Sequence, residues 1–93
     1  MHTRKLPLLS DIQAAAARMP GNVVRTPLVR AAKLSDLTSA NIFVKHENMQ
    51  ATNSFKDRGA LVKLKSLTSK QAKSGVIAMS AGNHAQGVAY HAQ

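Results

Sequence analysis

The sequence predicts an α/β fold of which this chain holds a part. Helix-like and strand-like segments alternate along its second half, and that order is typical of a parallel sheet covered by helices. One short apolar run, Val76–Met79, is bounded by Gly75 and Ser80, which favours a strand buried on both faces. Only one such strand follows Lys56, so we expect an incomplete three-layer parallel sheet and an N-terminal portion of a longer protein.

The first predicted element is a helix over Leu9–Arg18. Its alanines have high helix propensity, Ser10 or Asp11 is the predicted cap, and Pro20 ends it. Its expected role is packing.

Three short segments follow. Thr26–Arg30 is predicted to be extended, because Pro27 disfavours helical geometry at the residue before it. Leu34–Thr38 is predicted to be a second short strand or a turn. Ile42–Glu47, apolar and β-branched at its start, is a good strand candidate.

A lysine is predicted in the first turn of the next helix. Ser54 is the predicted N-cap, Asp57 follows three positions later and can reach back toward the cap, and an apolar run comes next. Lys56 therefore lies where the unsatisfied backbone N–H groups disfavour an ammonium ion. The neutral amine that forms a Schiff base benefits from this position and from desolvation beside Phe55.

Three helices are predicted from Lys56 to the end of the chain, and Ser74-Gly75 ends the second of them. The first is marked by apolar residues at helical spacing, Ala60, Leu61, Leu64 and Leu67. A short helix capped by Thr68 or Ser69 runs to Lys73, and the last begins near Asn83.

The loop Ser80–Ala85 lies between the predicted buried strand and the last helix, where α/β proteins place ligand-binding loops. Gly82 permits close approach of the backbone to a ligand, and the Ser80 hydroxyl and the helix N–H groups can hold a carboxylate or phosphate. Asn83 offers both a donor and an acceptor.

The two motifs together carry a resemblance. Ser54–Ala60 and Ser80–Ala89 resemble the fold-type II pyridoxal-phosphate enzymes, the tryptophan synthase β family, and within it the threonine dehydratase (threonine ammonia-lyase) branch. Arg25–Leu28 and Lys45–Gln50 are also similar to segments of that branch. The resemblance covers Arg25 to the end of the chain, and two ordered motifs are far more specific than one.

The resemblance implies pyridoxal 5′-phosphate as the cofactor, with Lys56 as the Schiff-base lysine and the base that removes the substrate α-proton. Phe55 would pack by the cofactor ring and Asn83 would hydrogen-bond its 3′-oxygen. The implied substrate-binding residues are Ser80, Ala81, Gly82 and His84. The implied reaction, in the parent protein, is elimination from threonine or serine to a 2-oxo acid and ammonia.

The resemblance also implies a domain division, with residues 1–50 beginning a large domain and 51–93 a small one. Because the family's glycine-rich phosphate loop lies downstream, we expect the 93-residue chain to be inactive alone. We expect a cytoplasmic homo-oligomer for the full-length parent, and no metal site.

Other functions remain open at this point. The net charge of +9 admits a basic nucleic-acid-binding module, but the charges are scattered and only 3% of residues are aromatic, so we expect neither nucleic-acid nor membrane binding. Threonine synthases share the lysine motif. Serine racemases carry a second serine where this chain has Ala81, which favours elimination over racemisation. A non-catalytic truncated remnant is the remaining alternative.

Overall fold

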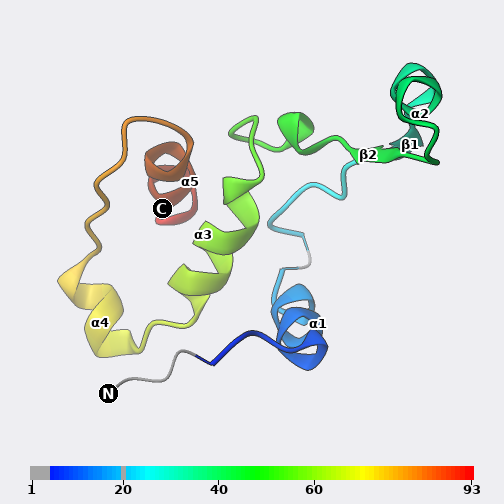
Figure 1. Ribbon diagram of the computed structural model, residues 1–93. Helices are drawn as coiled ribbons and strands as arrows, with labels where there is room; N and C mark the ends of the chain where they lie inside the picture. The colour runs from blue at the N-terminus through cyan, green and yellow to red at the C-terminus, as the bar shows by residue number, and fades with distance from the viewer. Residues whose placement is uncertain (1–4, 20) are drawn as a thin grey trace.

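The computed structural model describes residues 5–19 and 21–93, and Figure 1 shows their course. The elements in chain order are α1 (Leu9–Ala17), β1 (Leu28–Arg30), α2 (Ala32–Thr38), β2 (Phe43–Lys45), the 3₁₀ turn η1 (Glu47–Met49), α3 (Lys56–Lys65), α4 (Ser69–Ser74) and α5 (Asn83–His91).

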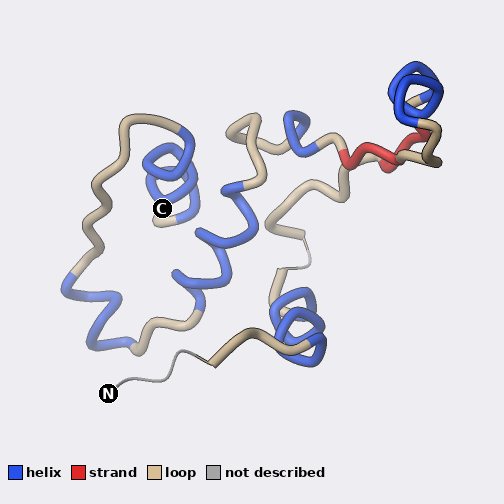
Figure 2. The backbone as a smooth tube through the Cα atoms, in the orientation of Figure 1, coloured by secondary structure: helices blue, strands red, loops and turns tan. Residues whose placement is uncertain are grey.

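The strands β1 and β2 form a small antiparallel pair in which Val29 lies opposite Val44. Helix α2 connects them, and the buried Ser35 ties it to the second strand, since its hydroxyl accepts a hydrogen bond of 3.0 Å from the Ile42 N–H. The unit forms one end of the molecule, away from α4 and α5 (Figure 2). The extended segment predicted at Thr26–Arg30 contains β1, and the strand predicted at Ile42–Glu47 is confirmed over Phe43–Lys45, whereas Glu47 begins the 3₁₀ turn η1.

Helix α3 is the centre of the other part, and α5 packs against it (Figure 1). Ala60 and Leu61 of α3 are the buried apolar side chains among the described residues. A Cβ built on Gly87 of α5 would lie 3.4 Å from the Lys56 carbonyl oxygen and 3.5 Å from the Ala60 Cβ. The small residues therefore allow the two helices to approach closely.

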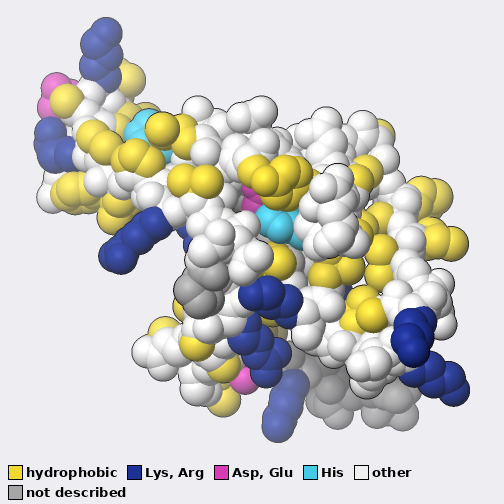
Figure 3. Space-filling view, turned by 180° about the vertical axis from the view of Figure 1, so that it is seen from behind, with side chains coloured by type: hydrophobic (Ala, Val, Ile, Leu, Met, Phe, Trp, Pro, Cys, Tyr) yellow, Lys and Arg dark blue, Asp and Glu magenta, His cyan; other side chains and the backbone are white. Residues whose placement is uncertain are grey.

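The described residues form an open arrangement. The radius of gyration is 16.3 Å, whereas a compact domain of this length has about 12 Å. Apolar side chains are accordingly spread over the surface (Figure 3), and Ile77 and Met79 are 99% and 98% exposed. Within the described part of the chain, no helix has the length and hydropathy needed to cross a membrane.

The prediction of a buried strand at Val76–Met79 is wrong for this chain. These residues lie outside any helix or strand, between α4 and α5, and they are exposed. A strand needs a neighbour to satisfy its backbone groups, and the two strands of the described residues pair with each other instead. The parallel sheet is therefore not formed within these residues.

Other local predictions fared differently. Leu34–Thr38 is helical rather than a strand or turn, and α2 ends where Ser39 takes a left-handed conformation with φ of 54°.

Helix α1 is confirmed, but its cap is Leu8, whose N–H donates to Asp11 at 2.8 Å. The predicted stop at Pro20 lies outside the described residues. Helices α4, with Thr68 as its cap, and α5 start as predicted.

Candidate active site

Lys56 is the first residue of α3, as predicted. A left-handed turn at Asn53, with φ of 61°, brings the chain into the helix. The capping residue is Phe55 rather than the predicted Ser54, but the buried Ser54 still contributes, because its hydroxyl accepts the Lys56 N–H at 3.2 Å. The Lys56 amine lies 5.4 Å from the centre of the Phe55 ring, a cation–π distance.

Asp57 has a larger role than that of a cap partner. Its carboxylate reaches back past Ser54 to Thr52, which donates its N–H at 3.1 Å and its hydroxyl. The oxygen that accepts the Thr52 hydroxyl, Oδ1, also lies 3.4 Å from Nε2 of His91 in α5. The side chain is fully buried, so it joins the loop, the start of α3 and the end of α5.

The loop before α5 is exposed and locally ordered by a serine. The Ser80 hydroxyl accepts the Gly82 N–H at 3.2 Å, and α5 begins at the next residue, Asn83. Ser80, Ala81, Gly82 and Asn83 are all exposed.

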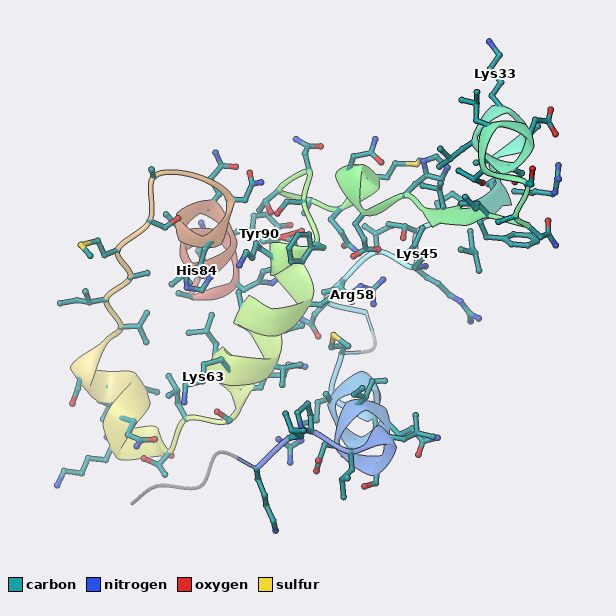
Figure 4. All side chains as sticks on the ribbon, viewed as in Figure 1. Lys33, Lys45, Arg58, Lys63, His84 and Tyr90 are labelled. Atoms are coloured by element: carbon teal, nitrogen blue, oxygen red, sulfur yellow. The ribbon has the colours of Figure 1, made fainter. Side chains whose placement is uncertain are left out.

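Lys56 and His84 meet at one pocket of about 240 Å³. Its lining consists of Phe55, Lys56, Gly59, Ala60 and His84. Figure 4 shows His84 on α5, beside α3. The structure thus brings together three of the predicted site residues, Phe55, Lys56 and His84. The other four do not line this pocket: Ser80, Ala81 and Gly82 belong to the loop before α5, and Asn83 is the first residue of that helix.

Sequence reasoning missed a polar network centred on Glu47. Its carboxylate receives two hydrogen bonds from Arg58 of α3, Nε at 2.7 Å and Nη2 at 3.0 Å, with further bonds from Thr26 and Gln50. Arg58 extends from α3 toward these residues (Figure 4). The network fixes the start of α3 to the strand unit.

The charges in this network are mutually stabilised. The bond from Arg58 is the main cause that lowers the pKa of Glu47 from 4.5 to about 2, with support from Thr26 and Gln50 against the opposing effect of burial. The same contact raises the pKa of Arg58. The signal in the sequence was the stretch Lys45–Gln50, which we interpreted as the end of a strand and as a segment similar to the threonine dehydratase branch, without a role for Glu47.

Among residues 5–19 and 21–93, no group of three or more acidic, histidine or cysteine side chains gathers in a way that suits a metal ion. The side chains that line the pocket supply a primary amine, an aromatic ring and an imidazole.

Comparison with known proteins gives the family context. The family described as pyridoxal-phosphate dependent enzyme matches residues 20–93. The chain is 48% identical over its whole length to the catabolic L-threonine dehydratase of Staphylococcus aureus (strain USA300) and 49% identical over 95% of its length to that of Escherichia coli (strain K12). It spans 27% of the length of each of these relatives.

Solved structures give the same picture. The T.th. threonine deaminase matches with a TM-score of 0.76 and 45% identity, over 92% of this chain and 30% of that one. A maize serine racemase matches with a TM-score of 0.81 and 34% identity, over 90% of this chain and 26% of that one. The predicted resemblance and the fold-type II class are thereby confirmed, with part of that fold present.

Proposed function

Since this chain belongs to the pyridoxal-phosphate dependent enzyme family, we propose that it supplies one half of a cofactor site, with Lys56 as the residue of attachment. The observation that carries the proposal is the pocket shared by Lys56 and His84, to which α3 and α5 bring residues 28 positions apart in the sequence. Both motifs that carry the family resemblance contribute to it.

The residues of the pocket fit the chemistry of a flat aromatic aldehyde. Lys56 offers a primary amine at the start of α3, and such an amine can condense with an aldehyde. Phe55 lies beside that amine. Gly59 and Ala60 project no bulk into the pocket, so a ring can approach α3.

The predicted site residues have separate roles in this proposal. Lys56 would hold the cofactor through its Nζ, and the same amine would take the proton from the α-carbon of the substrate. Asn83 would donate a hydrogen bond to the oxygen on the cofactor ring. The substrate carboxylate would be bound by Ser80, Ala81 and Gly82 of the loop before α5 and by His84 in the first turn of that helix. The bound cofactor supplies the electron sink for the charge that develops at the α-carbon.

The loop geometry supports the task of carboxylate binding. Backbone N–H groups at the start of a helix attract anions, and the loop that leads into α5 is exposed and therefore accessible to a small substrate. The hydrogen bond from Gly82 to Ser80 holds the loop in a compact turn.

We propose elimination from threonine or serine as the reaction of the whole protein, because the curated relatives are named threonine dehydratases. Ala81 favours this reaction over racemisation, since it offers no side-chain group for proton transfer on the second face of the substrate. The domain division at residue 50, the homo-oligomer and the cytoplasmic location remain predictions.

The test is attachment of the cofactor to a single lysine. The purified chain is incubated with pyridoxal phosphate, reduced with borohydride and digested, and the labelled peptides are identified by mass spectrometry. We expect the label at Lys56, its loss in Lys56→Ala, and no change in the matched control Lys63→Ala, which removes an exposed lysine of the same helix. Equal labelling of Lys56 and Lys63 would contradict the proposal.

A second assay separates the lyase from a non-catalytic remnant. A protein of the relatives' length that contains this chain is incubated with cofactor and L-threonine or L-serine, and 2-oxo acid and D-serine are measured. We expect 2-oxo acid that depends on Lys56. Formation of D-serine alone would favour a racemase, and no product from either substrate would favour the remnant.

A further inference from the structure

A buried polar contact joins the two helices that carry the proposed site. Asp57, next to Lys56 in the sequence, is fully buried, and the His91 side chain is only 4% exposed. Asp57 Oδ1 and His91 Nε2 are 3.4 Å apart. The proposed chemistry uses neither residue, so the contact needs a different explanation.

The contact is sensitive to how α5 lies on α3. His91 Nε2 is buried and, among the described residues, has no partner at hydrogen-bond geometry although the carboxylate is near. The ring of the neighbouring Tyr90 meets the imidazole edge to face, with 4.9 Å between ring centres. A small displacement of α5 would either complete the hydrogen bond or break the contact.

Asp57 is itself held in place by Thr52, whose N–H donates to Oδ2 and whose hydroxyl donates to Oδ1, the oxygen that faces His91. Its two bonds from Thr52 fix the carboxylate relative to the loop before α3. A buried carboxylate requires such partners, because burial removes its interaction with water. It therefore gives His91 a fixed point of contact beside Lys56.

One face of α5 touches α3 at three levels. His84, Gly87 and His91 are spaced i, i+3 and i+7, which places them on the same side of a helix. His84 shares the pocket with Lys56, Gly87 lies against the Lys56 backbone, and His91 meets Asp57. The contact of His91, at the end of α5, therefore affects the position of the loop that precedes the start of that helix.

We propose that Asp57 and His91 are positioning residues. Their contact holds α5 against the first turn of α3 and so sets the distance between the Lys56 amine and His84 in the first turn of α5. The relevance to catalysis rests on the proposed function, whereas the contact between the helices does not.

The first test measures the arrangement of the helices without cofactor. The chain has no cysteine, so spin labels can be attached to Lys63→Cys on α3 and Gln86→Cys on α5, both exposed positions. Double electron–electron resonance then reports the distance between them. We expect one narrow distribution that shifts or broadens with Asp57→Asn or His91→Gln, and stays unchanged with the exposed control Asp36→Asn.

The second test asks whether the contact affects the lysine. In the cysteine-free chain, Asp57→Asn and His91→Gln are treated with pyridoxal phosphate and borohydride, at a temperature where circular dichroism shows unchanged helix content. We expect the preference for Lys56 over Lys63 to be lost in both variants. A contact that only stabilised the fold would lower the melting temperature and leave this preference intact.

The outcomes distinguish the two proposals. Unchanged distances in both variants, or a broad distribution in the spin-labelled chain before Asp57 or His91 is changed, would overturn the positioning role. Unchanged preference for Lys56 despite shifted distances would also overturn it. A chain that never prefers Lys56, but whose distances shift in the variants, would contradict the proposed function and support the helix contact.

Discussion

Neutralising Glu47 should weaken the attachment of α3 to the strand unit. The change Glu47→Gln keeps the size of the side chain and its capacity to accept a hydrogen bond, but removes the charge that faces Arg58. Thr26 and Gln50 also lose an ionic acceptor. We therefore expect a lower free energy of unfolding with little change of structure.

The magnitude follows from the acidity of the carboxyl group. A fall in the pKa of Glu47 from 4.5 to about 2 corresponds to at most about 3 kcal/mol of stabilisation. The Arg58 side chain is 33% exposed, so solvent screens the pair and we expect about 1–2 kcal/mol. Because the pKa is lower in the folded state, this contribution is complete above pH 4.5 and disappears as the pH falls toward 2.

Urea unfolding followed by circular dichroism measures this effect. The difference between the unsubstituted chain and Glu47→Gln should be largest near neutral pH and should shrink below pH 4.5. Asp36→Asn, an exposed carboxylate on α2, is the matched control and should change little. A difference that stays constant across this pH range, or one no larger than that of the control, would refute the reasoning.

Three further substitutions test the packing by the same unfolding measurement. Leu61→Ala should cost toward the lower end of about 2–5 kcal/mol, because Leu61 is buried but borders an existing cavity; a cost near zero would show that α3 has no core. Gln50→Ala should cost about 1–3 kcal/mol, since the amide pairs with both the N–H and the carbonyl of Val24 at 2.9 and 2.7 Å; stability like that of the unsubstituted chain would exclude this role. Gly87→Val should cost about 1–3 kcal/mol through its contact with α3, and equal effects of Gly87→Val and the exposed Ala89→Val would contradict the close approach.

Elements governed by local chemistry could be predicted from the sequence. The start of α3 depends on Ser54 and on the turn before it, and α4 is set by Thr68 at one end and Gly75 at the other. These signals act within a few residues. The predicted N-cap of α3, Ser54, was wrong by one position. The cap is Phe55, and the Ser54 hydroxyl accepts the Lys56 N–H from the position before it.

Elements that depend on distant partners could not be predicted in the same way. Val76–Met79 has the composition of a buried strand, but pairing requires a neighbouring strand, and the two strands that the structure describes pair with each other. The helix at Leu34–Thr38 was missed because its apolar residues were interpreted as extended. The alanines before Leu34 carried the helical signal.

The candidate site shows the same division. The motifs around Lys56 and Asn83 identified the two loops, and the structure brings Lys56 and His84 to one pocket. The contacts of Asp57 with His91 and of Glu47 with Arg58 join residues 34 and 11 positions apart. A single sequence does not show which polar residues pair across such distances, because each of these residues is of a type that is common on protein surfaces.

The central claim is that Lys56 is the residue to which pyridoxal phosphate becomes attached. The most direct measurement exposes the chain to less than one equivalent of cofactor, reduces the product, and compares the labelled fraction of every lysine over time. We expect Lys56 to be labelled first, in the unsubstituted chain and in the Lys63→Ala variant alike. Labelling spread evenly over the exposed lysines, or unchanged in Lys56→Ala, would contradict it.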